Sequence, residues 1–253
     1  MMTNPMDLSG RVFVVTGASS GIGRDNSVFL SELGASVVLV GRNAEQLNKT
    51  VNLLSGSGHR VEPFDLQNVD AIPAWLKGIS EKTGPLDGIV HCAGLEALRP
   101  IKMISKESFI DLMNINVNAA IGLTKGFRQK KVNRSGGSLV YISSVAGLVG
   151  QTAHAEYCAS KAALIGLCKA AALELARENI RVNCIAPGLI HTELTEKALN
   201  TLSPEQLNAI KDYHPLGMGR PRDVSNAVAF LLADTGRWIT GSTLVVDGGY
   251  TVH

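Results

Sequence analysis

Residues 11–35, RVFVVTGASSGIGRDNSVFLSELGA, decide the fold. A Val-rich run of strand length leads into a turn that contains Gly17, Gly21 and Gly23, and a segment of helical character follows. Glycines in such a turn let the backbone bend tightly and approach a pyrophosphate, whose charge then lies at the positive end of the helix. The stretch therefore predicts a βα unit that binds a dinucleotide, although an ordinary βα loop also has this pattern. Asn26 falls on the apolar stripe of the helix, and the pattern gives no reason for it.

The rest of the chain repeats this kind of unit. Apolar runs of strand length alternate with longer segments of helical period, which is typical of a parallel sheet with helices on both faces. We expect strands near residues 11–16, 36–41, 59–64, 86–91, 137–143, 180–185 and 243–247. A chain of 253 residues is long enough to bury one large core, so we predict a single domain over residues 1–253.

Composition narrows the classes of partner. The net charge is +2 with 18% charged residues, which gives no basic surface for nucleic acid, so we expect a small-molecule partner. The four cysteines lack metal-ligand spacing and clustered histidines, so neither a metal site nor a disulfide framework is predicted. The polar N-terminus has no signal-peptide pattern, and no apolar run is long enough to span a bilayer. We expect a cytoplasmic protein that uses no membrane.

A second motif joins Ser144, Tyr157 and Lys161. Ser144 ends an apolar strand, and Tyr157 and Lys161 lie one turn apart in the Ala- and Leu-rich segment 156–175, which we expect to be helical. A phenol with a pKa of ~10 transfers protons poorly at neutral pH unless a nearby cation stabilises its anion. With Ser144 holding the developing charge, this set suits hydride transfer at a carbonyl carbon. The alternative is a packed phenol beside a lysine that merely reaches for solvent.

Together these motifs resemble the short-chain dehydrogenase/reductase family. The resemblance rests on Thr16-Gly17-Ala18-Ser19-Ser20-Gly21-Ile22-Gly23, on Ser144, and on Tyr157-Cys158-Ala159-Ser160-Lys161, and it covers nearly the whole chain. It implies an α/β fold of the Rossmann type, doubly wound, with a seven-stranded parallel sheet and helices on both faces. It also implies that Asn116, placed by the family's spacing from Phe109, completes the catalytic set by holding a water that links the lysine to solvent.

The end of the second expected strand predicts which dinucleotide binds. Gly41 stands where NAD-specific members of the family carry Asp, and Arg42 follows it. A carboxylate there would repel a 2′-phosphate, whereas an arginine fork suits one. NADP(H) is therefore favoured over NAD(H), although the basic residue that the family often has at Ser20 is missing. The alternative is that Arg42 is a surface residue at the start of the next helix and contacts no cofactor.

The resemblance assigns the remaining cofactor contacts. Asp65 would bind the adenine amino group or, alternatively, cap the next helix. His91-Cys92-Ala93-Gly94 departs from the family pattern in its first two residues, and we expect His91 to be a core histidine bonded to a neighbouring loop. The full expected cofactor set is Gly17, Ser19, Ser20, Gly21, Ile22, Gly23, Arg42, Asp65, Leu66, Ala93, Gly94, Tyr157, Lys161, Pro187, Gly188, Ile190 and Thr192.

Three functions stay open. The chain most resembles 3-oxoacyl-[acyl-carrier-protein] reductases, which implies reduction of a ketone or acyl thioester, with acyl carrier protein as a possible partner. One alternative is a dehydrogenase of a sugar, polyol or other secondary alcohol. The other is a cofactor-binding protein without catalytic activity, and the intact catalytic set argues against it. The resemblance further implies a homotetramer and a substrate lid over residues 188–215. The pocket wall around Glu96, Leu98, Val149 and His154 carries no chemical signature in the sequence.

Overall fold

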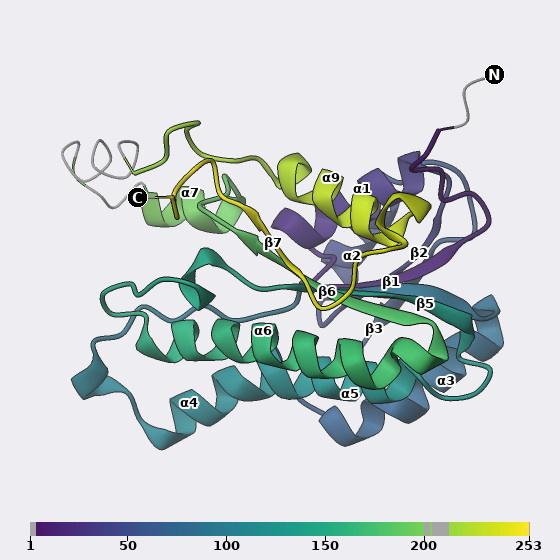
Figure 1. Ribbon diagram of the computed structural model, residues 1–253, viewed down its shortest axis with the longest axis horizontal. Coiled ribbons are helices and arrows are strands. Elements are labelled where there is room, and N and C mark those ends of the chain that lie inside the picture. Colours follow the sequence, from purple (N-terminus) through teal and green to yellow (C-terminus); the bar gives the residue numbers. More distant parts are fainter. Residues whose placement is uncertain (1–3, 200–202, 204–212, 253) are drawn as a thin grey trace.

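Seven parallel strands form the central layer of the fold (Figure 1). The computed structural model describes residues 4–199, 203 and 213–252, and within them the strand order is β3-β2-β1-β4-β5-β6-β7. The strands are β1 (Val12–Thr16), β2 (Ser36–Gly41), β3 (Arg60–Pro63), β4 (Leu86–His91), β5 (Asn133–Ile142), β6 (Ile180–Pro187) and β7 (Thr243–Val246). Every neighbouring pair is parallel, which confirms the predicted fold class.

Strand β5 departs from its expected bounds. It begins at Asn133 rather than near residue 137, and its pairing with β4 shifts register between Leu86 and Gly88. Ser135 lies in the left-handed region with φ of 59°, so the backbone bulges here before regular pairing resumes at Ser138. The strand passes through Gly136 and Gly137, which follow Ser135.

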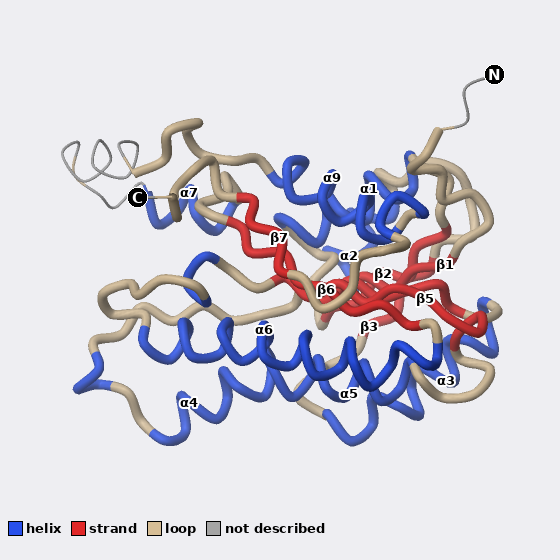
Figure 2. Tube along the Cα trace, in the orientation of Figure 1, coloured by secondary structure: helices blue, strands red, loops and turns tan. Residues whose placement is uncertain are grey.

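Helices cover both faces of the sheet (Figure 2). They are α1 (Gly21–Glu32), α2 (Ala44–Val51), α3 (Ile72–Thr83), α4 (Lys106–Met113), α5 (Ala119–Phe127), α6 (Ala155–Leu175), α7 (Glu193–Leu199) and α9 (Pro221–Leu232). Side chains of β1 alternate between two cores, because successive residues of a strand point to opposite faces. Val12 and Val14 pack with α3, α5 and α6, whereas Phe13 and Val15 pack with α1, α2 and α9.

The long helical region expected after Ser105 is interrupted. Between α4 and α5, residues Asn114–Asn118 form a π-helical turn, which contains all three asparagines of the region. A π turn widens the helix locally and often marks a functional site. Asn116 is fully buried there, while Asn114 and Asn118 bond to each other through their side chains.

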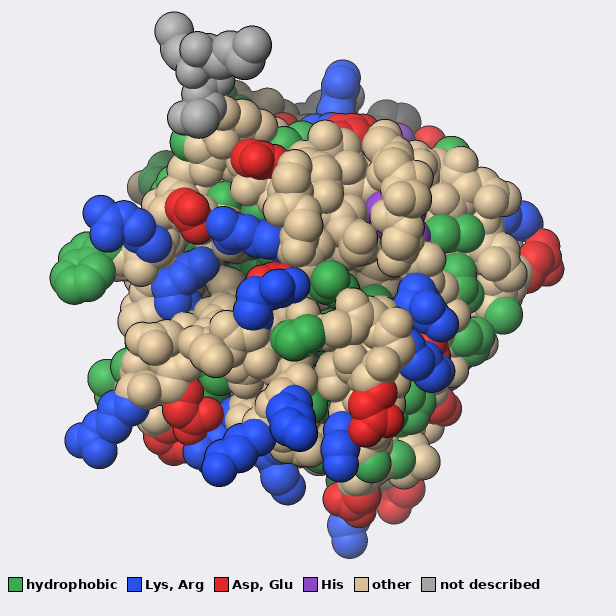
Figure 3. All heavy atoms as spheres, turned by 90° about the vertical axis from the view of Figure 1, so that its right-hand side faces the viewer, with side chains coloured by type: hydrophobic (Ala, Val, Ile, Leu, Met, Phe, Trp, Pro, Cys, Tyr) green, Lys and Arg blue, Asp and Glu red, His purple; other side chains and the backbone are tan. Residues whose placement is uncertain are grey.

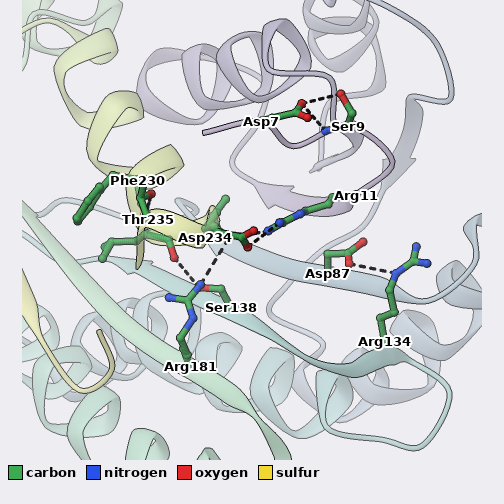
Figure 4. Close-up of polar contacts among 12 residues, drawn as sticks. Asp7, Ser9, Arg11, Asp87, Arg134, Ser138, Arg181, Phe230, Asp234 and Thr235 are labelled. Carbon is green, nitrogen blue, oxygen red and sulfur yellow. Dashed lines mark hydrogen bonds and ion pairs between the residues drawn. The ribbon is translucent and has the colours of Figure 1, made fainter. Parts of the chain in front are cut away.

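Two ion pairs join neighbouring segments at the amino ends of the strands. Figure 4 shows Arg11, which precedes β1, reaching Asp234 after α9 at 2.7 Å, and Arg134 of β5 reaching Asp87 of β4 at 3.1 Å. Figure 3 views the end of the molecule at the right of Figure 1, where Lys and Arg side chains gather. Among the helices that the structure describes, none is long and apolar enough to cross a membrane.

The strand order places the binding crevice at the other end. The chain winds outward from β1 in one direction and from β4 in the other, so a crevice opens beyond the carboxyl ends of these two strands. Gly17 follows β1 directly, and Cys92 follows β4. The glycine-rich turn that begins at Gly17 and the segment Cys92-Ala93-Gly94 therefore lie side by side where the strand order changes direction.

Candidate active site

A pocket of about 1070 Å³ lies at the carboxyl ends of the strands. Its wall includes every residue of the expected cofactor set, together with Ser144. Asn116 is the one expected site residue that does not line it. The structure thus brings together residues from the turn after β1, the ends of β2 to β6 and the start of α6.

The turn after β1 packs tightly against α1 and against the loop after β4 because Gly17 and Gly23 have no side chains. Gly17 has φ of +66°, and a Cβ on it would meet the Ala93 backbone nitrogen at 2.9 Å. A Cβ on Gly23 would lie 2.2 Å from the Gly17 carbonyl oxygen. At the start of α1, the Ser20 side chain makes no capping hydrogen bond, so it leaves the first N–H groups of the helix available to an anion. These features fit a pyrophosphate.

The adenosine end of the pocket is formed by Gly41 and Arg42. Within the described part of the chain, no carboxylate pairs with Arg42, and its side chain is exposed. Arg24, by contrast, is engaged, since it donates to the Ser19 carbonyl oxygen at 2.6 Å and pairs with Glu193 at 2.7 Å. Arg42 is therefore the guanidinium at this end that can turn toward a phosphate.

Asp65 does not cap the next helix, whose N-cap residue is Asn68, and its contact with the adenine amino group stays a prediction. Its Oδ1 accepts the backbone N–H of Gln67 at 3.0 Å, which fixes the turn after β3. It also lines the pocket beside Leu66. The carboxylate therefore faces the crevice while it holds its own loop in place.

Tyr157, Lys161 and Ser144 meet in the centre of the pocket. Lys161 Nζ donates to the Ile142 carbonyl oxygen at 2.9 Å and lies 5.4 Å from the centroid of the Tyr157 ring. Burial lowers the pKa of Lys161 to about 8. Burial and then the charge of Glu96 raise the pKa of Tyr157, and a hydrogen bond with Ser144 acts in the opposite direction. At neutral pH the phenol is protonated beside a cation, which is the arrangement that a proton donor needs.

Asn116 holds the loop after β4 against α6. Its amide accepts the Leu95 N–H at 2.7 Å and donates to the Leu95 carbonyl at 3.0 Å and to Ser160 at 2.9 Å. A Cβ on Gly94 would lie 3.1 Å from Asn116 Oδ1 and 3.4 Å from Lys161 Nζ, so Asn116 is adjacent to the lysine. The water that we expect Asn116 to hold stays a prediction.

The polar residues that the motifs did not explain lie directly under the pocket. His91 is buried and bonds to Thr16 Oγ1 at 3.0 Å, which also accepts the Ala93 N–H. Burial, followed by the charge of Lys161, lowers the pKa of His91 to about 4, so the ring is neutral and ties β1 to β4. Asn26 donates to Cys92 Sγ at 3.3 Å, whereas its buried Oδ1 has no hydrogen-bond partner among the described residues.

Of the four residues expected at the pocket wall, Glu96 and His154 line the pocket, whereas Leu98 and Val149 do not. Glu96 comes from the loop after β4 and His154 from the loop before α6, with Nε2 of His154 3.5 Å from Oε1 of Glu96. The sequence placed both residues at the pocket wall but did not show that their side chains contact each other. Part of the expected lid over 188–215 is described, including α7, but residues 200–202 and 204–212 lie outside the described residues.

Comparison with known proteins gives matches along nearly the whole chain. The family model described as Enoyl-(Acyl carrier protein) reductase matches residues 17–251. The 3-oxoacyl-[acyl-carrier-protein] reductase FabG of Rickettsia prowazekii is 36% identical over 96% of this chain and 98% of its own length. That of Thermotoga maritima is 33% identical over 98% of this chain and its own full length (100%).

Solved structures agree with the sequence matches. A putative short-chain alcohol dehydrogenase from Sinorhizobium meliloti superposes with a TM-score of 0.92 at 32% identity and covers 98% of this chain and 99% of its own. A putative 2-deoxy-d-gluconate 3-dehydrogenase from Agrobacterium tumefaciens with bound NADP has a TM-score of 0.89 at 29% identity, over 99% of this chain and 100% of its own.

Proposed function

The chain belongs to the short-chain dehydrogenase/reductase family of NAD(P)-dependent oxidoreductases, and from this premise we propose that it transfers hydride between NADP(H) and a ketone or secondary alcohol. The observation that carries the proposal is the meeting of Tyr157, Lys161 and Ser144 in one pocket with the glycine-rich turn. The nicotinamide supplies or accepts the hydride when it is bound. The chain's own residues manage the proton and the charge on the substrate oxygen.

In the reducing direction the Tyr157 hydroxyl gives its proton to the carbonyl oxygen. The Ser144 hydroxyl donates a hydrogen bond to the same oxygen as negative charge develops on it. The Lys161 ammonium, 5.4 Å from the Tyr157 ring centroid, stabilises the phenolate that remains. In the oxidising direction the same groups act in reverse order.

Preference for NADP(H) is supported by the end of β2. Gly41 offers no carboxylate to repel a 2′-phosphate, and Arg42 beside it has no carboxylate partner among the described residues. A related structure carries bound NADP, which agrees with this preference. Residues Ile190 and Thr192, which we propose for the carboxamide, line the same pocket after β6.

For the substrate, the names of the relatives favour a 3-oxoacyl thioester. Delivery by an acidic carrier protein is less favoured, because the Glu178 carboxylate pairs with Arg128 at 2.5 Å and offsets its positive charge. A polyol or sugar is the second candidate, because Glu96 and His154 make the substrate side of the pocket polar. We further propose a homotetramer in the reducing cytoplasm, where the four cysteines remain free thiols.

A screen of carbonyl compounds with NADPH tests the proposal. The compounds are 3-oxoacyl thioesters, diketones, hydroxyketones and keto sugars, and the readout is the loss of NADPH absorbance. We expect turnover with at least one class and loss of that turnover in Tyr157→Phe. NADPH oxidation that the substitution does not affect would refute the assignment of the proton donor.

A further inference from the structure

The hydroxyl of Thr195 ties together the backbone of the corner between β6 and α7. Its oxygen accepts the Thr192 N–H at 2.7 Å and lies 2.7 Å from the Ile190 carbonyl oxygen, to which it donates. Ile190 and Thr192 are the residues that we propose for the nicotinamide carboxamide, and Thr195 lines the pocket with them. The sequence motifs did not single out Thr195, although it lies only three residues beyond Thr192.

A hydroxyl has one proton and two lone pairs, and the contacts of Thr195 use all of them. Its proton goes to the nearer of two carbonyl oxygens, that of Ile190, because the Thr192 carbonyl oxygen is farther away at 3.0 Å. One lone pair accepts the Thr192 N–H. The other is available to the Thr192 hydroxyl, whose oxygen lies 3.1 Å away. Thr195 therefore holds both the backbone and the side chain of Thr192.

The Thr192 hydroxyl can serve a ligand while Thr195 holds it. Its oxygen accepts the Thr195 N–H at 3.3 Å, which fixes the side chain from a second direction. Because a hydroxyl rotates, its proton can be given either to Thr195 Oγ1 or to a carboxamide oxygen in the pocket. The Thr192 side chain stays in one place whichever acceptor it uses. A valine at position 195 has no oxygen and would remove this restraint.

Other contacts hold the corner in place without this hydroxyl. The His191 N–H donates to the Gly219 carbonyl oxygen at 2.8 Å. The carboxylate of Glu193 pairs with Arg24 of α1 at 2.7 Å. These two contacts flank the corner on both sides, and neither involves the Thr195 side chain. A variant without the hydroxyl should therefore keep the corner against α1 and lose the fixed direction of the groups at its centre.

We propose that Thr195 is a positioning residue for the nicotinamide, because it holds the Thr192 hydroxyl and the Ile190 backbone in the arrangement that binds the carboxamide. The inference rests on the proposed function, since it concerns the ring that carries the hydride. A ring held through its carboxamide presents one face to the substrate carbon beside Tyr157. Without the Thr195 hydroxyl, the dinucleotide still binds through its pyrophosphate and adenosine ends, and the ring loses its fixed orientation.

The test compares Thr195→Val, which keeps the shape of the side chain and lacks the hydroxyl, with Thr195→Ser, which keeps the hydroxyl. We expect kcat/KM for NADPH, with the carbonyl compound that wild type reduces best, to fall about 10- to 100-fold in Thr195→Val, the range for two lost hydrogen bonds. Thr195→Ser should stay within about threefold of wild type. Thr235→Val is the matched control, because the Thr235 hydroxyl also donates to a backbone carbonyl, that of Phe230 at 2.7 Å, and does not line the pocket (Figure 4).

Binding measurements separate positioning of the ring from damage to the whole site. Adenosine 2′,5′-bisphosphate carries the adenosine end of NADP and no nicotinamide, so its dissociation constant, measured by calorimetry, should be the same in wild type and Thr195→Val. NADPH itself should bind more weakly to Thr195→Val. In a variant that already carries Thr192→Val, adding Thr195→Val should lower kcat/KM by less than about threefold more, because both changes disrupt one hydrogen-bond network.

Four results would overturn the proposal. They are a wild-type kcat/KM in Thr195→Val, a loss in Thr195→Ser as large as that in Thr195→Val, weaker binding of the bisphosphate to Thr195→Val, and a double variant whose loss is the product of the two single losses. If wild type oxidises NADPH with no carbonyl compound, the proposed function fails instead. The dissociation constants of NADPH and the bisphosphate then still decide the role of Thr195.

Discussion

Removing one oxygen atom from Tyr157 gives the most direct test of the site. In Tyr157→Phe the ring keeps its place between Lys161 and His154, so the pocket wall is preserved. The carbonyl oxygen of the substrate loses its proton donor and retains the hydroxyl of Ser144. General acid catalysis contributes about 10²- to 10⁴-fold, so we expect kcat to fall by about that factor. The loss corresponds to about 3 to 5 kcal/mol of transition-state stabilisation.

The assay has two readouts, kcat from NADPH oxidation and the dissociation constant of NADPH from fluorescence titration. The dissociation constant should change by less than about threefold, because the other residues of the expected cofactor set still hold the dinucleotide. Tyr141→Phe is the matched control, since its hydroxyl bonds to Thr124 inside the core and away from the pocket. That variant should lose about 1 kcal/mol of stability and keep its kcat.

Two results would refute this reasoning. A kcat for Tyr157→Phe within about tenfold of wild type would show that another group donates the proton. A large loss of NADPH affinity together with kcat would show that the phenol binds the cofactor rather than the reacting oxygen.

Four further predictions follow from the same geometry. Because the pKa of Lys161 is lowered to about 8, its ammonium is lost above that pH, and kcat/KM for reduction should fall on the alkaline side of about 8 in a pH profile. Wild type should favour NADPH over NADH in kcat/KM, and Gly41→Asp with Arg42→Ala should reverse the ratio; a Cβ at Gly41 meets nothing closer than 3.4 Å, so the variant should fold. Sedimentation should give a tetramer, and Leu173→Asp should weaken it, because this leucine of α6 is 83% exposed in the single chain. A stable monomer at micromolar concentration would contradict this prediction. Because Glu178 neutralises Arg128, one 3-oxoacyl group should react at least as well on coenzyme A as on acyl carrier protein, and a large carrier advantage that fades with salt would overturn this.

Much of the fold could be predicted because its signals are local. The strands predicted near 36–41 and 86–91 have those bounds in the structure, since a run of apolar residues is enough to mark a buried parallel strand. The helix expected from 156 to 175 corresponds to α6. The start of β5 was missed because its pairing depends on a bulge, which is set by the neighbouring strand and not by the residues of β5 alone.

In the candidate site, too, the sequence predicted local features and missed those that depend on distant contacts. The glycine-rich turn and the Tyr157 and Lys161 pair were identified from spacing, because a turn of helix fixes which side chains lie together. The partners of Asn116 and the neutral state of His91 depend on burial and on contacts between distant segments. The spacing therefore located these residues without showing what they touch.

The sequence by itself determined the class of chemistry, and the tertiary structure decided the surroundings of the reacting carbon. A short motif carries its own geometry, because one strand end or one helical turn holds all of its atoms. Glu96 and His154 have no such local relation. Arg99 of the first loop contacts Ala153 and Glu156 of the second segment, and the two segments come together because the sheet pairs β4 with β5, the strands that precede them.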